Sequence, residues 1–470
     1  MSDNSAAANK QAAEKQAGEK PLKQSTLMLF GLPEYAVYLG SIPVGLYLPL
    51  VYSKDLGLEL ADVGLILMLA RISDVITDPL IGYLSDRTRS RGGRHKPWLA
   101  AGAGVMMVSA YQLFNPVPPI DNWHLLTWSV LLWLGWTMIN IPYYAWGAEL
   151  SSDYNERTRI TGWRQAFGFL GNVSVLAVPV IAGQLTGYGS LPREGLTIIG
   201  SMALVALPLL IAITLWGVPE RQAYAQPKSP LLKNARVMFK NGSFMLLFLG
   251  FMLMSLGTGW GSATFMLYAT YTIEAEAYTQ AILLGFYGAN LVSLPVWVAI
   301  AQRIGKKPTW MTGGVLFVIV TPCFLLLGAG DLWGFFITLG FYGIAAGNFG
   351  ALSMSMKADV IEIASRRSGE NIAGSYIAVW SLGQKMVAAV ALGLALPFLQ
   401  YLGFDPSGDV GPEQAQILAW VYVLPPWLFY AISVYFIARY PISASRLARL
   451  RSAFDRRDER RARTAAQAAS

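Results

Sequence analysis

Three ionisable residues, Arg71, Asp74 and Asp78, lie within one long apolar stretch of the sequence. Their spacings of three and four residues place them on one face of a helix. An ionisable group at the centre of a bilayer costs at least about 2.5 kcal/mol, so three together require a partner, a water-filled cavity or a bound ion. Two acids one turn apart raise each other's proton affinity. The pair is therefore a candidate proton or sodium site, and a buried Arg/Asp network that only ties helices together is the alternative interpretation.

Other polar residues fall at membrane depth in separate apolar stretches. They are Glu34, Tyr38 and Ser41 in the first stretch, Thr137 and Asn140 in the fourth, Arg164 in the fifth and Lys385 in the eleventh. For each residue taken singly, a hydrogen bond between helices is the commoner explanation. Together, with acids in the first half of the chain and a lysine in the second, they favour a polar path between the two halves. Pro79 removes a backbone donor and frees the carbonyl of Val75, so we expect the helix to loosen there.

The elements that must position these residues are membrane-spanning helices. Of the 470 residues, 54% are hydrophobic and 14% are charged, whereas a soluble domain has roughly 25% charged residues. Apolar stretches of about 20 residues, the length that crosses a bilayer, occur at residues 26–52, 60–84, 98–116, 123–149, 160–184, 195–218, 242–269, 278–302, 309–329, 332–356, 371–400 and 414–438. Only helices satisfy every backbone amide across such spans. The sequence predicts an all-α membrane protein with twelve transmembrane helices in two six-helix bundles.

The polar segments divide the chain. We expect a disordered cytoplasmic N-terminal tail at residues 1–25, an N-terminal bundle at 26–218, a cytoplasmic linker at 219–241, a C-terminal bundle at 242–440 and a basic cytoplasmic tail at 441–470. Lys and Arg gather in the loops on one side of the predicted membrane, so both termini are predicted to be cytoplasmic. The basic tail carries Leu447, Leu450 and Phe454 among its arginines. It fits either a helix lying on an anionic leaflet or a solvated helix.

A short internal repeat supports two related halves. The sequence GRHKPW at residues 93–98 follows the second stretch of the first half, and GKKPTW at 305–310 follows the second stretch of the second half. A six-plus-six repeat is typical of transporters that rock two bundles about a site at the membrane midplane.

Several classes of function are disfavoured. With one cysteine and two histidines, the chain cannot form an internal disulfide or supply a Cys/His zinc site. The net charge of +8 is scattered between apolar stretches rather than gathered on one soluble face, so nucleic acid is not an expected partner. The common motifs of metalloproteases, nucleotide-binding proteins and serine hydrolases do not occur. We therefore expect neither an enzyme nor a bound cofactor.

Three segments resemble the glycoside-pentoside-hexuronide:cation symporters, a family of the major facilitator superfamily that includes the melibiose permeases. These segments are DVITDPLIGYLSDRTRSRGGRHKPW from Asp74 to Trp98, NIPYYAWGAELSSDYNERTRITGWRQ from Asn140 to Gln165, and KADVIEIASRRSGENIAGSYIAVWSLGQK at residues 357–385. The resemblance covers residues 26–440 and both halves. It implies the major facilitator fold.

The resemblance also implies roles for individual residues. Asp74 and Asp78 are similar to the family's cation-binding carboxylates, which are the only metal ligands expected here if sodium is the coupled ion. Thr77, Thr137 and Asn140 occupy assisting positions at that cation site. Arg164 and Lys385 are similar to the family's polar residues at the substrate site, and Asp86 and Arg87 resemble its cytoplasmic gate motif. The full set of residues that we expect at the substrate site is Glu34, Tyr38, Arg71, Tyr144, Arg164 and Lys385.

The chain departs from the family pattern at three of these positions. Tyr38 stands where sugar-binding members have an aspartate, and Glu34, one turn earlier, is a possible substitute. Asn140 replaces a third acid, and Tyr144 replaces a tryptophan. These changes leave galactoside recognition in doubt, and they leave Na⁺ and H⁺ open as the coupled ion.

The leading hypothesis is cation-coupled symport of a glycoside, a uronide or a related small polar solute by alternating access. The alternative is a lysophospholipid or amphipathic-anion transporter on the same fold, because a related branch with similar acids moves lysophospholipids. The expected partners are the solute and the lipid bilayer. We further expect a monomer that spans the bacterial inner membrane many times.

Overall fold

The computed structural model describes residues 22–90, 92–151, 153–189, 191–220, 238–368 and 372–469. Within these ranges the chain forms helices and no strand. It divides into two compact units, Met1–Gln226 and Pro227–Ser470, each of which is described here by itself. Most of the predicted N-terminal tail and residues 221–237 of the predicted linker lie outside the described residues. The proposed domain boundaries therefore stay predictions.

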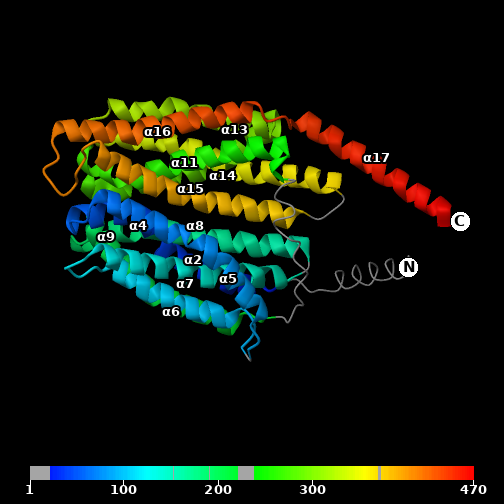
Figure 1. Ribbon diagram of the computed structural model, residues 1–470, viewed down its shortest axis with the longest axis horizontal. Helices are drawn as coiled ribbons and strands as arrows, with labels where there is room; N and C mark the ends of the chain where they lie inside the picture. The colour runs from blue at the N-terminus through cyan, green and yellow to red at the C-terminus, as the bar shows by residue number, and fades with distance from the viewer. Residues whose placement is uncertain are drawn as a thin grey trace. The chain divides into compact units, whose positions relative to one another are not determined.

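The first unit is a bundle of helices (Figure 1). Its α-helices are α2 Gln24–Leu46, α3 Leu48–Leu50, α4 Leu60–Ile72, α5 Asp74–Arg87, α6 Lys96–Phe114, α7 Asn122–Glu149, α8 Tyr154–Thr186 and α9 Pro192–Gly217, with a π-helical turn, η1, at Val51–Asp55. Helix α2 packs on α8 and α9, α6 lies against α7 and α9, and α7 contacts α4 and α5.

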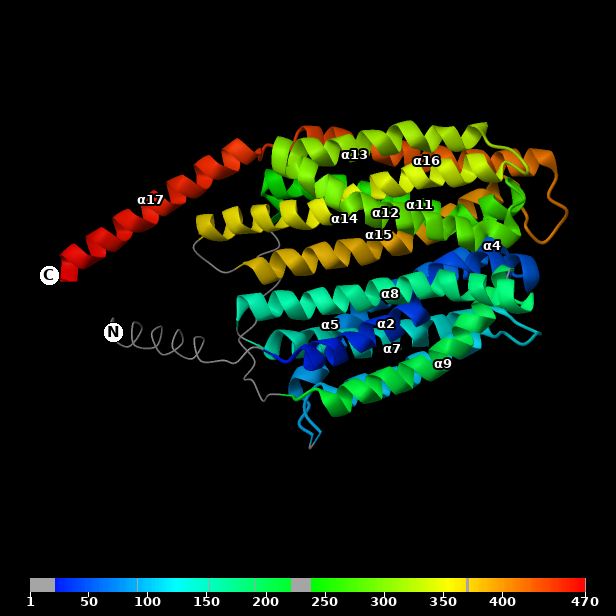
Figure 2. The ribbon, with the colours of Figure 1, turned by 180° about the vertical axis from the view of Figure 1, so that it is seen from behind.

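The second unit repeats the bundle form and is seen well from behind (Figure 2). Its α-helices are α11 Gly242–Tyr271, α12 Thr279–Ile304, α13 Lys306–Val320, α14 Leu332–Ser368, α15 Ala373–Tyr401, α16 Pro412–Ala438 and α17 Ala444–Ala469, with 3₁₀ turns η2 Glu276–Tyr278 and η3 Thr321–Leu326. Helix α11 contacts α15 and α16, and α14 contacts α12 and α13.

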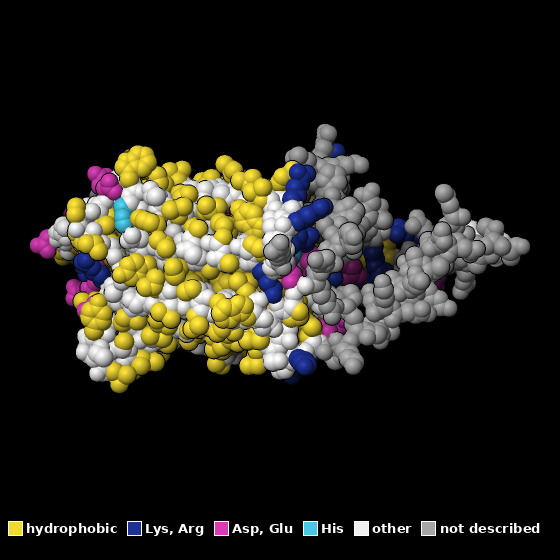
Figure 3. Space-filling model, turned by 90° about the horizontal axis from the view of Figure 1, so that it is seen from below, with side chains coloured by type: hydrophobic (Ala, Val, Ile, Leu, Met, Phe, Trp, Pro, Cys, Tyr) yellow, Lys and Arg dark blue, Asp and Glu magenta, His cyan; other side chains and the backbone are white. Residues whose placement is uncertain are grey.

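Ten helices in the described part of the chain are long and apolar enough to cross a membrane. The predicted stretch 60–84 is divided between the short helices α4 and α5, and the stretch 98–116 falls mainly in the 19-residue helix α6. Neither is among the ten, so the count of twelve stays a prediction. On the face drawn in Figure 3, hydrophobic side chains cover the middle and charged side chains gather toward the ends, as expected of a surface that meets lipid.

Small residues let the helices of the first unit approach closely. A Cβ atom on Gly171 of α8 would lie 2.7 Å from the backbone oxygen of Tyr35 on α2, and a Cβ atom on Gly135 of α7 would lie 2.7 Å from the backbone nitrogen of Met106 on α6. Glycine at such positions lets helix backbones pack in direct contact within a bilayer. The backbone of α2, which carries Glu34 and Tyr38, is thereby held against α8, which carries Arg164.

The two copies of the short basic repeat make matching contacts. The ammonium of Lys96 donates to the carbonyl oxygen of Leu215 at the end of α9 (2.7 Å), and that of Lys307 donates to the carbonyl oxygen of Ala438 at the end of α16 (2.8 Å). In each half, the lysine before the proline thus binds a carbonyl near the end of that half's last candidate membrane-spanning helix. A cation there also complements the negative end of the helix dipole.

A second contact is repeated in the same way. Arg94 forms an ion pair with Glu149 at the end of α7, and Lys306 pairs with Asp359 on α14. The residue that opens each repeat, Gly93 or Gly305, has a positive φ of 104° or 93°, which glycine adopts without strain. The sequence repeat is therefore also a repeat in contacts, which supports two structurally related halves.

The first turns of α17 pack on the second unit. Leu447 is buried, and Leu450 and Phe454 pack against that unit's hydrophobic core. Arg451 donates to Glu362 on α14 (2.6 Å), and this hydrogen bond raises the pKa of the Arg451 guanidinium. This part of the basic tail is bound to protein rather than solvated on all sides.

Candidate functional site

The helix that carries the two candidate cation ligands is interrupted between α4 and α5. The interruption lies at Ser73, whose carbonyl oxygen accepts hydrogen bonds from the backbone nitrogens of Ile76 and Thr77 (3.0 Å each). We expected the loosening at Val75 and Pro79, but α5 runs through both. A proline ring disturbs the turn that precedes it, but Ser73 lies more than one turn before Pro79, so the ring does not explain the interruption. Asp74 consequently becomes the first residue of α5.

Asp74 is fully buried and is paired with Arg71. Its Oδ2 atom lies 3.0 Å from Nη1 of Arg71, and Asp74 is 0% exposed. The Arg71 guanidinium stacks on α7, with its central carbon 3.7 Å from the ring centroid of Trp133 and 5.4 Å from that of Trp136. Paired in this way, the guanidinium gains both a counter-charge and aromatic faces. Arg71, which we expected at the substrate site, thus contacts the candidate cation site, and its role stays a prediction.

Asp78 is half-buried one turn further along α5 and faces α7. Its Oδ1 atom accepts a hydrogen bond of 3.0 Å from the hydroxyl of Thr137, which is itself fully buried. Among the described residues, the buried Thr77 hydroxyl oxygen has no hydrogen-bond partner. Asn140 is buried, and its amide nitrogen donates to the carbonyl of Trp136 in its own helix (3.1 Å). Carboxylates and hydroxyl oxygens are the donors that hard cations prefer.

A second polar cluster joins α2, α7 and α8. Glu34 is 4% exposed, its Oε2 atom lies 3.5 Å from Nε of Arg164, and its Oε1 atom accepts a 3.4 Å hydrogen bond from the hydroxyl of Tyr144. The Arg164 guanidinium carbon lies 3.9 Å from the ring centroid of Tyr144 and 5.0 Å from that of Tyr143. Three of the predicted substrate residues, from three helices, are therefore in one cluster.

Tyr38 lies beside this cluster because α8 carries a glycine there. A Cβ atom on Gly168 would be 3.1 Å from Cγ of Glu34 and 3.2 Å from Cε2 of Tyr38. Both side chains therefore lie against the α8 backbone at Gly168, where there is no side chain to keep them away. A larger side chain at residue 168 would displace them.

Helix α7 connects the two clusters. Thr137 contacts Asp78 in the first, and Tyr144 contacts Glu34 in the second. Residues 137, 140 and 144 are spaced by three and four, so they share one face of the helix. Movement of this face would affect both clusters at once.

Lys385, Asp86 and Arg87 are the remaining predicted site residues. Lys385 is half-buried on α15 in the second unit. Asp86 and Arg87 end α5, and the Arg87 guanidinium carbon lies 4.1 Å from the ring centroid of Tyr83. The roles of these three residues stay predictions.

Sequence reasoning missed the aromatic partners of Arg71. Trp133 and Trp136 precede Thr137 and Asn140 at helical spacings, and this periodicity was the available signal. Of the aromatic residues that are candidates for stacking on sugars, Trp146, Trp260, Tyr268 and Trp380 are buried in packing, whereas Tyr144 is 41% exposed. Tyr144 is therefore the one of these five whose ring a solute can reach.

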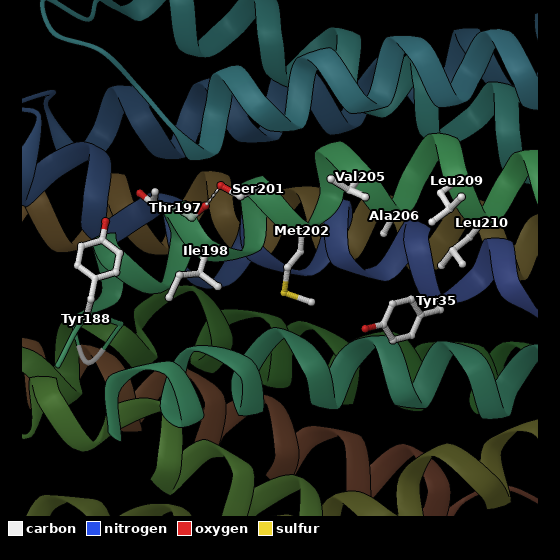
Figure 4. Close-up of a pocket in the computed structure, with 10 residues that line it drawn as sticks. All are labelled: Tyr35, Tyr188, Thr197, Ile198, Ser201, Met202, Val205, Ala206, Leu209 and Leu210. Carbon is white, nitrogen blue, oxygen red and sulfur yellow. Dashed lines mark hydrogen bonds between the residues drawn. The ribbon is translucent and has the colours of Figure 1, made fainter. Parts of the chain in front are cut away.

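A separate apolar groove of about 620 Å³ runs along α9 (Figure 4). The hydroxyl of Ser201 donates to the carbonyl of Thr197 within it (3.0 Å). Its lining residues are Tyr35, Tyr188, Thr197, Ile198, Ser201, Met202, Val205, Ala206, Leu209 and Leu210. None of them is a predicted site residue.

Comparisons with known proteins agree on the kind of molecule. Residues 29–444 match the family described as MFS/sugar transport protein. The inner membrane symporter YicJ of Escherichia coli (strain K12) is 24% identical over 87% of this chain and 90% of its own length. The sodium-dependent lysophosphatidylcholine symporter 1-A of Danio rerio is 24% identical over 86% of this chain and 83% of its own length.

Solved structures share the fold. The inward-open xylose transporter XylE from E. coli superposes with a TM-score of 0.59 at 16% identity, covering 91% of this chain and 98% of that one. The nucleoside transporter NupG gives 0.62 at 14% identity, covering 88% and 97%. The family match, the symporter relatives and the helical architecture lead to one conclusion: the chain belongs to the MFS/sugar transport protein family and is a membrane transporter, not an enzyme.

Proposed function

We propose that the protein is a secondary active transporter that couples the entry of Na⁺ or H⁺ to the import of a glycoside, a uronide or a related small polar solute by alternating access. The observation that carries the proposal is the pair of carboxylates on the interrupted second span. Asp74 is neutralised by Arg71, and Asp78 faces the hydroxyl of Thr137. A carboxylate beside a hydroxyl, at a depth where charge is costly, is suited to bind and release a small cation.

We expect the incoming cation to bind at Asp78, where Thr77 and Thr137 supply hydroxyl oxygens and Asn140 supports the same face of α7. If the cation strengthens solute binding, the solute must strengthen cation binding by the same factor. One positive charge moved through about 100 mV supplies about 2.3 kcal/mol, which is roughly fifty-fold accumulation.

The Glu34 cluster is the proposed solute site in the first unit. A buried carboxylate accepts hydrogen bonds from sugar hydroxyls, the Arg164 guanidinium donates several, and the exposed Tyr144 ring offers an apolar face. Tyr38 completes this surface, and Lys385 is the proposed contribution of the second unit. The relative named as the putative glycoside/cation symporter YagG of E. coli, 22% identical over 84% of this chain, supports a glycoside as the solute.

A second candidate function is cation-coupled transport of a lysophospholipid or another amphipathic anion. The sodium-dependent lysophosphatidylcholine symporter relative supports this function. The apolar groove along α9 also supports it, because an acyl chain needs such a surface. The hypothesis predicts uptake that requires an acyl chain.

The proposed setting is the bacterial inner membrane, with both termini cytoplasmic and a monomer as the working unit. The basic loops would then lie on the cytoplasmic side of the membrane. Asp86 and Arg87, the last residues of α5, are the proposed cytoplasmic gate. Cysteine labelling of residues 5 and 465 from each side of a sealed vesicle tests this orientation, after Cys323 is replaced by serine. Labelling of either site from the outside would contradict it.

The experiment that tests the function is accumulation of solutes from a mixed pool of glycosides, uronides and lysophospholipids into proteoliposomes. Separate preparations carry an imposed Na⁺ gradient, an H⁺ gradient or neither, and mass spectrometry reads the lumen. We expect one class of solute to accumulate above the external concentration only with one of the gradients. Equal filling with and without both gradients would contradict symport, and accumulation of lysophospholipid alone would establish the second candidate.

A further inference from the structure

Lys357 is a charged side chain of α14 that the proposed mechanism does not use. It is half-buried, and its ammonium nitrogen lies 5.2 Å from the ring centroid of Trp380 on α15. Among the described residues, this ammonium has no carboxylate within ion-pair distance and no hydrogen-bond acceptor. Lys357 directly follows the predicted apolar stretch 332–356, and a half-buried charge is costly unless something neutralises it.

The acids nearest in sequence on α14 are already engaged by other cations. Asp359 accepts from Lys306 (2.5 Å) and from Arg451 (3.3 Å), and Glu362 accepts from Arg451 (2.6 Å). The neighbouring acids are thus matched with cations from α13 and α17. They leave Lys357 as a positive charge for which the described residues provide no counter-charge.

The aromatic ring beneath Lys357 is held rigidly. Trp380 is 1% exposed, and its ring centroid lies 4.6 Å from that of Phe251 and 5.8 Å from that of Phe248 on α11. A cation over a tryptophan ring is attracted by the ring's quadrupole, but the ring does not neutralise the charge. The ammonium is therefore positioned by a fixed surface while its hydrogen-bond donors remain available to a ligand.

We propose that Lys357, seated on Trp380, binds an anionic group of the transported solute. This inference rests on the proposed function and narrows its substrate class to solutes that carry a negative charge. A lysine ammonium is a compact point charge that pairs with a carboxylate or a phosphate alike. The shared chemistry is therefore a solute anion, which is the carboxylate of a uronide or the phosphate of a lysophospholipid.

The test is ligand binding by the purified full-length chain, measured by calorimetry with matched pairs of ligands. Methyl glucuronide is compared with methyl glucoside, methyl galacturonide with methyl galactoside, and lysophosphatidic acid with monoacylglycerol. Four proteins are compared: the wild type and the variants Lys357→Gln, Lys357→Arg and Lys240→Gln. Lys240 is an exposed lysine, so its variant is the control for loss of one positive charge.

We expect the wild type to bind the acid of at least one pair and to bind its neutral partner at least about tenfold more weakly. Lys357→Gln should remove this preference, whereas Lys357→Arg and Lys240→Gln should retain it. If the wild type prefers a uronide, the solute anion is a carboxylate. If it prefers lysophosphatidic acid, the anion is a phosphate. The inference is overturned if no acid binds better than its neutral partner, or if Lys357→Gln keeps the preference.

Thermal unfolding of the empty proteins separates a binding role from a structural one. A half-buried charge without a counter-charge destabilises the folded state, so Lys357→Gln should unfold at an equal or higher temperature than the wild type. A clearly lower unfolding temperature would contradict the proposal, because it would show that the lysine stabilises the unit. Failure of the proposed function would be seen in a different experiment, the proteoliposome assay, in which every solute of the pool would then enter to the same level with and without an ion gradient.

Discussion

Asp74 and Asp78 lie one turn apart on α5 but have different partners. Asp74 is buried against Arg71, whereas Asp78 is half-buried and reaches the Thr137 hydroxyl. The residue types and their spacing alone predicted a charged pair on one helical face. They could not predict which acid would take the arginine, because that depends on how the interrupted helix lies against Trp133 and Trp136. We expect Asp78, which is half-buried beside a hydroxyl, to be the acid that exchanges its cation.

Thr137→Ala should change binding of the coupled cation in a direction that depends on the ion. It removes the hydroxyl that lies 3.0 Å from Asp78, which is a proposed oxygen ligand for Na⁺ and a donor that stabilises the charged carboxylate against protonation. We expect the concentration for half-maximal uptake, as measured in proteoliposomes, to rise by about tenfold if Na⁺ is the coupled ion and to fall if H⁺ is. Thr137→Ser keeps the hydroxyl and is the matched control, so an equal effect of both variants would argue against the contact.

Arg164→Ala should destabilise the protein more than the double variant Glu34→Gln, Arg164→Gln. The single change leaves the Glu34 carboxylate buried without its cation, which costs about 3 kcal/mol or more in comparable pairs, whereas replacing both charges removes that penalty. Thermal unfolding in detergent compares the three proteins. A double variant as unstable as Arg164→Ala would show that the pair at 3.5 Å is not an energetic unit.

At the scale of the elements, hydropathy located the helices well but not their interruptions. Ten helices long and apolar enough to span a membrane coincide with predicted stretches, whereas the charged second stretch is divided at Ser73. From the position of Pro79 we predicted that the helix would loosen at Val75. The interruption lies instead at Ser73, because it depends on local backbone hydrogen bonds that the sequence does not show. The close contact of α2 with α8 was also not predicted, because single glycines are common in membrane helices.

Gly171→Ala should loosen the contact between α2 and α8. The added Cβ would meet the Tyr35 carbonyl oxygen at 2.7 Å, which is backbone and cannot rotate away. Overpacking of this kind costs about 1–3 kcal/mol, so we expect a lower unfolding temperature and weaker solute binding. Gly162→Ala lies on the same helix with nothing within 4 Å and is the control. Equal behaviour of the two variants would refute this account of the helix contact.

At the scale of the whole molecule, the composition and the repeated basic motif predicted a two-half transporter. The family match over residues 29–444 and the symporter relatives confirm the family and the transport function. They do not identify the solute, because the chain departs from the family pattern at Tyr38, Asn140 and Tyr144. The structure adds the contacts of Glu34 and Arg164, which depend on packing between helices distant in sequence.

The most direct test of cation coupling through Asp78 compares Asp78→Asn with Asp62→Asn in proteoliposomes. Asp62 is an acid of α4 that accepts a hydrogen bond from Asn122 near the surface (2.6 Å), so its variant controls for loss of one acid. For each protein, gradient-driven accumulation is measured beside exchange of labelled for unlabelled solute without a gradient. We predict that Asp78→Asn retains exchange but loses accumulation, while Asp62→Asn retains both. Full accumulation by Asp78→Asn would contradict the account.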